Sequence, residues 1–238
     1  MTTGTNIATE VRTQLNDGDT NNYRWSDAEL LLYINAGQRQ IVTLVPEANV
    51  VEEQVTLSDA VRQTLPSGGV KFFGVWNYDG AAGVRGPAIT PIERDALDTS
   101  FPEWSYAGHM ATHMNYPTFE DEHTEFLFEH YWHDPREPKA YYLFPPTDGE
   151  TPDVLLRYAK LPTALGSLSG TFALGDEYLN AEVEYVTYRC LMKDGRYSAH
   201  PSRRQELWNN FRQALGLKIE SDDRVDPATK RPPGDQHG

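Results

Sequence analysis

The sequence of 238 residues has a single cysteine, Cys190, and no long hydrophobic run. One cysteine excludes an intrachain disulfide and a thiolate cluster for zinc. The longest apolar run, Leu30 to Ile34, is far shorter than the roughly 18–20 residues that span a bilayer. Residues 1–6 also lack the basic flank and hydrophobic stretch of a signal peptide. We therefore expect a fold held by packing alone, with no membrane segment and no export signal.

Positive charge is also scarce, because 21 Lys and Arg residues stand against 35 Asp and Glu residues and give a formal net charge of -14. A surface this negative repels nucleic-acid phosphate and anionic lipid at long range. The basic pairs Arg203-Arg204 and Lys230-Arg231 are too few to form a nucleic-acid patch against this background. Sequence-specific DNA binding is therefore disfavoured.

Motifs for covalent or nucleotide chemistry are missing as well. The chain contains no Gly-x-Ser-x-Gly, Ser-x-x-Lys or Gly-x-Gly-x-x-Gly motif and no phosphate-binding loop. Cys190 lies on the apolar face of a predicted helix, where a cysteine is usually a small buried hydrophobe and not a nucleophile. Neither an enzymatic activity nor a cofactor is expected from these residues.

Two helices are expected early in the chain. An apolar residue at every fourth position from Ile7 predicts a short amphipathic helix over 6–16. Ser26 and Glu29 form a capping box, which predicts a second helix over 27–45. The predicted apolar face of this second helix consists of Leu30, Ile34, Gly37, Ile41 and Leu44.

From residue 50 the pattern changes to short apolar runs separated by turn residues, which is typical of β-strands. Two of these runs, 55–57 and 61–65, are expected to pair with each other. A second strand pair is expected around the glycine-containing turn at 79–83. Three further predicted strands are 126–132, 140–144 and 154–159.

Three more helices are predicted. A capping box of Thr90 and Glu93 predicts a brief helix near 91–98, inside the β region. Apolar residues spaced by three and four from Leu179 to Cys190 predict a helix that begins after Gly175-Asp176 and is ended by Asp194-Gly195. A last helix is predicted over 201–215.

The predicted fold class is α+β: a four-helix bundle with an inserted antiparallel β module and an extended C-terminal arm. The bundle is expected to be discontinuous and to comprise 1–48 and 172–218, with a β-rich domain over 49–171 between its second and third helices. Residues 219–238 contain three prolines, eight charged residues and almost nothing apolar. Alone they cannot bury enough surface to offset chain entropy, so we expect them to form the arm.

A histidine-rich region raises the alternative of a metal-dependent enzyme; its members are His109, His113, His123, His130 and His133, with acidic residues among them. His109 and His113 have the spacing of a helical zinc pair, but the residues between them lack the glutamate that serves as general base. His130 and His133 lie in a predicted strand, where odd spacing sends the side chains to opposite faces. Solvated or interfacial histidines are therefore the favoured interpretation.

The aromatic residues of the predicted strands have two interpretations. Large amphipathic rings are enriched at interfaces, but in sheets they more often form cores and cross-strand pairs. The candidate partner contacts are Trp76, Tyr78, Tyr131 and Trp132 in the strands and Arg224, Asp226, Pro227, Lys230, Arg231 and Pro232 in the arm.

Four segments carry a family resemblance: Trp25 to Val42 with Pro46-Glu47-Ala48, Asp134 to Pro146, Asp176-Glu177-Tyr178 with Tyr185 to Asp194, and Leu215-Gly216-Leu217-Lys218. In this order and spacing they resemble the head-to-tail adaptor (connector) proteins of tailed bacteriophages, over roughly residues 20–218.

The resemblance implies a helical bundle with a β insertion that assembles as a twelve-fold ring beneath the portal. It also implies a C-terminal arm that orders along the portal or a neighbouring copy. The expected partners are the portal protein, neighbouring copies and a tail nozzle or tail-tube protein, while DNA passes through the channel during ejection without specific binding. The expected function is a structural virion protein of the neck, at the head–tail interface, and a tail-tube or tail completion protein is the alternative.

Overall fold

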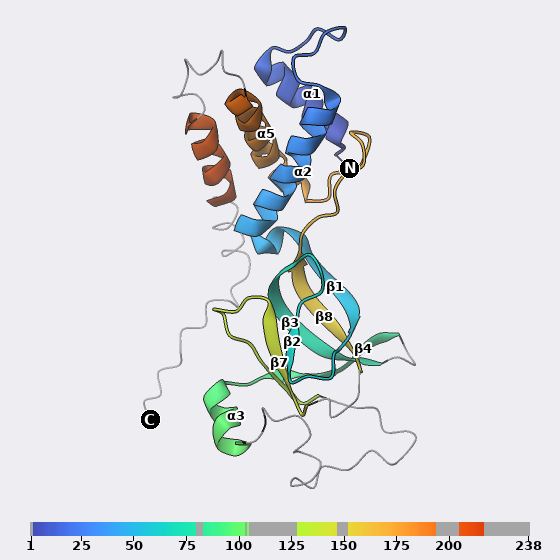
Figure 1. The fold of residues 1–238 in the computed structure, drawn as a ribbon, viewed down its shortest axis with the longest axis vertical. Coiled ribbons are helices and arrows are strands. Elements are labelled where there is room, and N and C mark those ends of the chain that lie inside the picture. Colours follow the sequence, from blue (N-terminus) through green and yellow to red (C-terminus); the bar gives the residue numbers. More distant parts are fainter. Residues whose placement is uncertain are drawn as a thin grey trace. The chain divides into compact units, whose positions relative to one another are not determined.

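The structure is a computed structural model, and it describes residues 2–79, 83–102, 104, 128–146, 152–193 and 205–216. The chain divides into two compact units, which are coloured along the sequence in Figure 1. The helical unit comprises Met1–Asn49 and Leu161–Gly238, and the β unit comprises Val50–Lys160. None of the helices in the described ranges is long and apolar enough to cross a membrane.

The helical unit begins with α1 (Gly4–Leu15). The Thr3 side chain accepts a hydrogen bond from the backbone N–H of Asn6, and the Asn6 side chain accepts one from the Thr3 N–H. These two bonds satisfy donors that the first turn would otherwise leave unpaired. The helix predicted over 6–16 is therefore present, but it begins two residues earlier than its apolar spacing indicated.

The second helix, α2 (Asp27–Leu44), begins with the capping box that the sequence predicts, formed by Ser26 and Glu29. This helix is therefore confirmed to within one residue. Four positions of its predicted apolar face are buried, but Leu44 is 47% exposed. It occupies the last turn, just before the chain enters a short 3-10 helix at Pro46–Asn49.

The last part of the helical unit contains α5 (Leu179–Lys193), which follows a short 3-10 helix at Asp176–Tyr178. The helix predicted between Asp176 and Asp194 is therefore confirmed, and Cys190 is fully buried in it. A further helix spans 205–216, so the described part of the helix predicted over 201–215 begins at residue 205.

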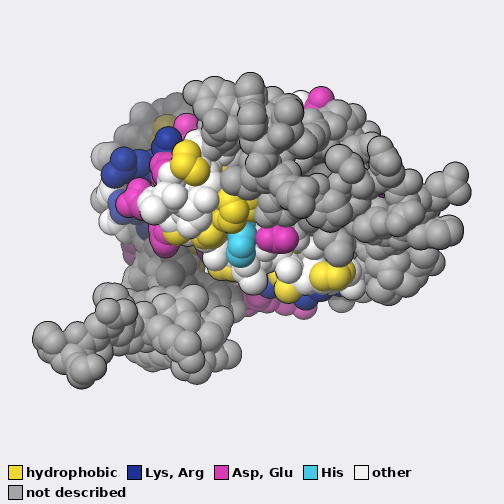
Figure 2. Space-filling model, turned by 90° about the horizontal axis from the view of Figure 1, so that it is seen from below, with side chains coloured by type: hydrophobic (Ala, Val, Ile, Leu, Met, Phe, Trp, Pro, Cys, Tyr) yellow, Lys and Arg dark blue, Asp and Glu magenta, His cyan; other side chains and the backbone are white. Residues whose placement is uncertain are grey.

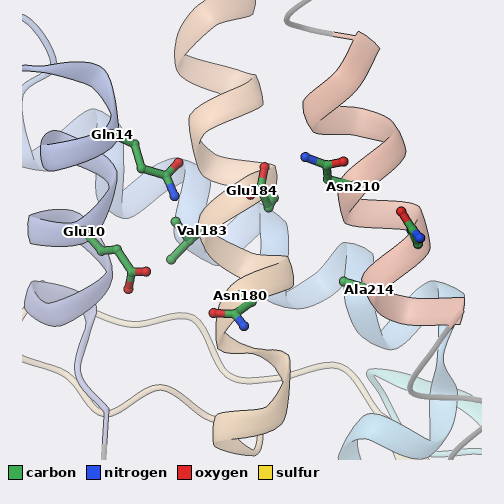
Figure 3. Close-up of a pocket in the computed structure, with 8 residues that line it drawn as sticks. Glu10, Gln14, Asn180, Val183, Glu184, Asn210 and Ala214 are labelled. Atoms are coloured by element: carbon green, nitrogen blue, oxygen red, sulfur yellow. The ribbon is translucent and has the colours of Figure 1, made fainter.

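The predicted four-helix bundle is wrong, and the observed architecture is a mixed α+β fold with two four-stranded sheets. In a four-helix bundle every helix contributes to one shared apolar core. Here α1, α2 and α5 contact one another, and the helix over 205–216 packs on α5, with the Tyr185 and Phe211 rings 5.4 Å apart. A polar pocket lies between this last helix and α1, where a bundle would have an apolar seam (Figure 3).

Backbone hydrogen bonds tie the beginning of α1 to the segment that precedes α5. The Gly4 N–H donates to the Gly170 carbonyl at 3.0 Å, and the Thr5 N–H donates to the Leu168 carbonyl at 2.7 Å. A β-bridge between Thr3 and Thr171 continues this pairing. Segments that lie before and after the β unit in the sequence therefore pair within the helical unit.

The first sheet of the β unit is antiparallel throughout and has the strand order β1-β8-β3-β4. Its strands are β1 (Val50–Thr56), β8 (Asp153–Lys160), β3 (Gly69–Asp79) and β4 (Val84–Ala88). The strand pair predicted around the turn at 79–83 is confirmed as β3 and β4.

The second sheet has the order β2-β7-β6-β5. Its strands are β2 (Arg62–Thr64), β7 (Ala140–Phe144), β6 (His130–Trp132) and β5 (Thr90–Pro91). The β5–β6 pair is parallel, so the prediction of a purely antiparallel module is wrong at this edge. β6 occupies only the last three residues of the strand predicted over 126–132, of which residues 126 and 127 lie outside the described part.

Two local predictions in the β unit are wrong. The runs at 55–57 and 61–65 do not pair, because β1 pairs with β8 in one sheet and β2 pairs with β7 in the other. The predicted cap Thr90 belongs to β5, where its hydroxyl donates to the Glu129 carbonyl. The helix α3 (Arg94–Ser100) consequently starts after Glu93, which makes no side-chain capping bond.

The β unit is built around two apolar clusters. In the larger one the Phe72 and Tyr141 rings stack with centroids 4.8 Å apart. Asn77 is buried at the edge of this core and bonds to both backbone groups of Phe128: its Nδ2 donates to the carbonyl at 2.9 Å, and its Oδ1 accepts from the N–H at 2.9 Å. This buried amide therefore stands in for a strand partner at Phe128.

Candidate functional site

The helical unit has a polar pocket of about 420 Å³ between α1, α5 and the helix over 205–216 (Figure 3). The residues that line it are Glu10 and Gln14 from α1, Asn180, Val183 and Glu184 from α5, and Asn210, Gln213 and Ala214 from the last helix. Six of these eight side chains are acids or amides, and none is a lysine or an arginine. This chemistry suits a hydrogen-bonding cation better than an anion or an apolar ligand.

Glu184 is the most perturbed acid of this pocket. Burial raises its pKa, repulsion from Glu206 adds to the shift, and a hydrogen bond with Asn210 acts in the opposite direction. One of its oxygens, Oε2, is buried without a hydrogen-bond partner in the described part of the chain. A positively charged donor placed in the pocket would therefore stabilise the ionised carboxylate.

A second acid, Glu182, lies on another face of α5 and is fully buried. Burial raises its pKa well above the ordinary value, and neither carboxylate oxygen has a partner within the described residues. Gly37 of α2 makes room for it, because a Cβ at that position would collide with the Glu182 carboxylate. The neighbouring Gln38 accepts a hydrogen bond from the Ala173 N–H at 3.0 Å.

On the first sheet, Trp76 is half-buried beneath an arginine. The Arg85 guanidinium lies 4.0 Å from the centroid of the Trp76 ring and forms a salt bridge of 2.8 Å with Glu52. Both partners of this salt bridge are substantially exposed, so the pair itself contributes about 0–1 kcal/mol. One face of the Trp76 ring is therefore covered within the chain.

On the second sheet, Trp132 is half-buried in an aromatic group. Its ring centroid lies 4.7 Å from that of Tyr142 and 6.4 Å from that of Trp104. The Arg94 guanidinium is 5.4 Å from the Trp132 centroid. In Figure 2, hydrophobic side chains gather beside basic and acidic ones on one face of the molecule, with a histidine among them.

The structure places the remaining candidate contacts differently. Tyr131 packs against the larger cluster of the β unit, with its ring 5.4 Å from that of Phe72, and Tyr78 is half-buried in β3. The four aromatic candidates are thus divided between two sheets. The candidates in the arm, which are Arg224, Asp226, Pro227, Lys230, Arg231 and Pro232, lie outside the described residues. The assignment of all ten to a partner interface stays a prediction.

Two members of the histidine-rich region are described, and each makes a local contact. His130 Nδ1 lies 2.7 Å from the Thr90 hydroxyl, and His133 Nδ1 lies 2.8 Å from the Ala140 carbonyl oxygen. Within the described ranges, no three His, Cys, Asp or Glu side chains come together in a way that could hold a metal ion. His109, His113 and His123 lie outside those ranges.

The single cysteine is placed as the sequence indicates. Cys190 is fully buried, and burial, together with the negative charge of Asp17, raises the pKa of its thiol to about 12. A thiol that resists ionisation is a poor nucleophile.

The polar pocket and the buried Glu182 were not predicted from the sequence. Glu182 follows Leu179 by three residues and precedes Val186 by four, so it occupies a position within the apolar stripe of α5. A glycine at position 37, inside an otherwise good helix, was the complementary signal. The pocket had no such signal, because its residues come from three separate helices.

Comparison with known proteins gives one family match. The model of the family described as SU10 adaptor protein matches residues 1–233. No curated protein matches the chain.

Proposed function

Since the chain belongs to the SU10 adaptor protein family of phage head-to-tail adaptors, we propose that it is a structural component of the virion neck that joins the portal to the tail. In this proposal its copies form a ring, twelve-fold like the portal, and line part of the DNA channel. The observation that carries the proposal is the family match over residues 1–233, which covers both compact units.

The charge of the chain supports a role beside DNA without a role in binding it. Each copy carries a formal charge of -14, so a ring of copies would surround the channel with a potential that repels phosphate. Salt screens this potential over roughly 8–10 Å. DNA could therefore move through the ring without being held by its backbone.

The partners in this proposal are neighbouring copies, the portal protein and a tail nozzle or tail-tube protein. The arm over 219–238 orders on the portal or on a neighbouring copy. Trp76 and Trp132 are candidate contacts because each is only half-buried and presents a large ring beside an arginine.

The decisive experiment is electron cryo-microscopy of the intact phage particle that carries this chain. We expect density for both compact units in a ring between the portal and the tail. A location in the tail tube or elsewhere in the particle would overturn the proposal.

A binding assay with the portal protein of the same phage tests the arm separately. Deletion of 219–238 is expected to weaken portal binding at least tenfold. Alanine at Arg224, Lys230 and Arg231 should reproduce part of this loss, with alanine at Asp222 and Asp223 as the matched control. Unchanged binding after the deletion would show that the arm is not the portal contact.

A further inference from the structure

The polar pocket opens on the side of α5 that faces away from α2. Glu182 points toward α2, since a Cβ at Gly37 would touch its carboxylate. Successive residues of an α-helix are about 100° apart. Asn180 and Glu184 are each two positions from Glu182, about 200° around the helix, and both line the pocket. Figure 3 agrees, because α2 runs behind α5 in that view.

An exposed stripe runs along the opposite side of the same helix pair. Arg39 is two positions from Gly37 and therefore also about 200° around α2 from the face that contacts α5. Leu32 lies seven residues before Arg39, nearly two whole turns, and is 65% exposed. Thr43 lies one turn after Arg39 and is exposed. We call Leu32, Arg39 and Thr43 the α2 stripe.

The two features are complementary in charge. Arg39 is exposed, and no hydrogen bond or salt bridge of its side chain is found among the described residues. The pocket offers the carboxylates of Glu10 and Glu184 and the amide oxygens of its neighbours, without a basic side chain of its own. A guanidinium supplies five donors and prefers carboxylate acceptors, so it matches this set.

We propose that the polar pocket of one copy binds Arg39 of a second copy. This inference rests on the proposed function, because it names the contact between neighbouring copies. The pocket and the α2 stripe are different patches on opposite sides of the helical unit, so the contact is heterologous and repeats from copy to copy. Such a contact builds a ring when the rotation closes. It also gives copies of charge -14 a local attraction that offsets their mutual repulsion.

Charge reversal tests the pair in the full chain. Sedimentation velocity over a concentration series measures association of the wild-type chain and of the variants Arg39→Glu and Glu184→Arg. Each single variant is expected to weaken association at least tenfold, and the double variant is expected to recover most of the loss. Arg136→Glu, an exposed arginine of the β unit, is the matched control and should associate like wild type.

Cysteine cross-linking tests the geometry. The native Cys190 is buried, so a double variant with Thr43→Cys and Asn210→Cys keeps Arg39 and carries two accessible thiols on the proposed partner surfaces. Oxidation is expected to give a ladder of trimers and larger species, because each copy contacts two neighbours. A product that stops at dimers, or no cross-link at all, would overturn the proposed contact.

The results of these experiments can overturn the Arg39 contact without overturning the proposed function. Association that is unchanged in both charge variants would overturn the contact, whereas the position of the chain in the phage particle would still decide the function. Loss of association on deletion of 219–238, with Arg39→Glu unaffected, would assign the contact to the arm and overturn this pairing. A wild-type chain that neither associates nor cross-links would also overturn it.

Discussion

Replacing Glu182 by glutamine should abolish one component of the pH dependence of stability. Glu182 is fully buried between α5 and α2, without a hydrogen-bond partner among the described residues. Burial raises its folded-state pKa well above 4.5, so the folded chain keeps a proton at pH values where the unfolded chain has lost it. The stability that depends on this proton is fully present below pH 4.5 and is lost as the pH rises to the folded-state pKa.

The size of the pH dependence follows from the single proton that the folded chain retains on Glu182. Within that window the free energy of unfolding falls by about 1.4 kcal/mol for each pH unit. With a urea dependence of about 3 kcal/mol per molar, each pH unit lowers the unfolding midpoint of wild type by about 0.5 M. The Glu182→Gln variant lacks this contribution. Its urea midpoint should therefore rise relative to that of wild type by about 0.5 M for each pH unit.

The assay is urea unfolding followed by the helical circular dichroism signal at several pH values above 4.5. Glu182→Met is the second variant, because it also cannot ionise. It should remove the same pH dependence and be more stable than Glu182→Gln by about 1–3 kcal/mol at every pH, since it leaves no buried polar group unpaired. A constant difference between wild type and Glu182→Gln across the pH range would refute the reasoning.

Three further predictions concern single sites. Gly37→Ala should destabilise the chain by about 1–3 kcal/mol, because the added methyl group collides with the Glu182 carboxylate. The urea unfolding midpoint measures this loss of stability. Most of the loss should be absent when Gly37→Ala is introduced into a Glu182→Ala variant. Asn77→Ala should cost about 3 kcal/mol, because it removes the two hydrogen bonds between the buried Asn77 amide and the backbone of Phe128. Thermal unfolding measures this loss, and a value below 1 kcal/mol would contradict the prediction. Cys190 should resist alkylation by iodoacetamide in the folded chain and react when urea unfolds it. Mass spectrometry detects the added carbamidomethyl group. Rapid labelling without urea would contradict this prediction, because it would show that the thiol is accessible.

Local signals were sufficient to predict most helices. Ser26 and Glu29 define the start of α2 by a bond pattern within four residues, which no distant part of the chain can easily override. The start of α1 was missed by two residues because Asn6, not Glu or Gln, completes the box of Thr3. At Thr90 a distant part of the chain does override the local signal. Thr90 joins β5 of the second sheet, and its hydroxyl bonds to the Glu129 carbonyl and does not cap a helix.

Strand partners were much less predictable than strands. Val50 pairs with Ala159, at the far end of the β unit, and nothing in the seven residues of β1 identifies that partner. The interaction surfaces have the same limitation. Helical spacing identifies the polar face that carries Glu10 and the one that carries Asn210, but only tertiary packing brings the two faces to one pocket.

The pairing of residues 2–5 with 168–172 has a consequence for synthesis on the ribosome. The beginning of α1 leaves the exit tunnel long before its backbone partners are translated, whereas Val50–Lys160 is continuous and can fold first as a unit. The nascent chain therefore completes the inserted unit before the helices around its two ends can close. A chain truncated before residue 168 would therefore carry the whole β unit but lack the backbone partners of residues 2–5, which leaves its helices unsecured.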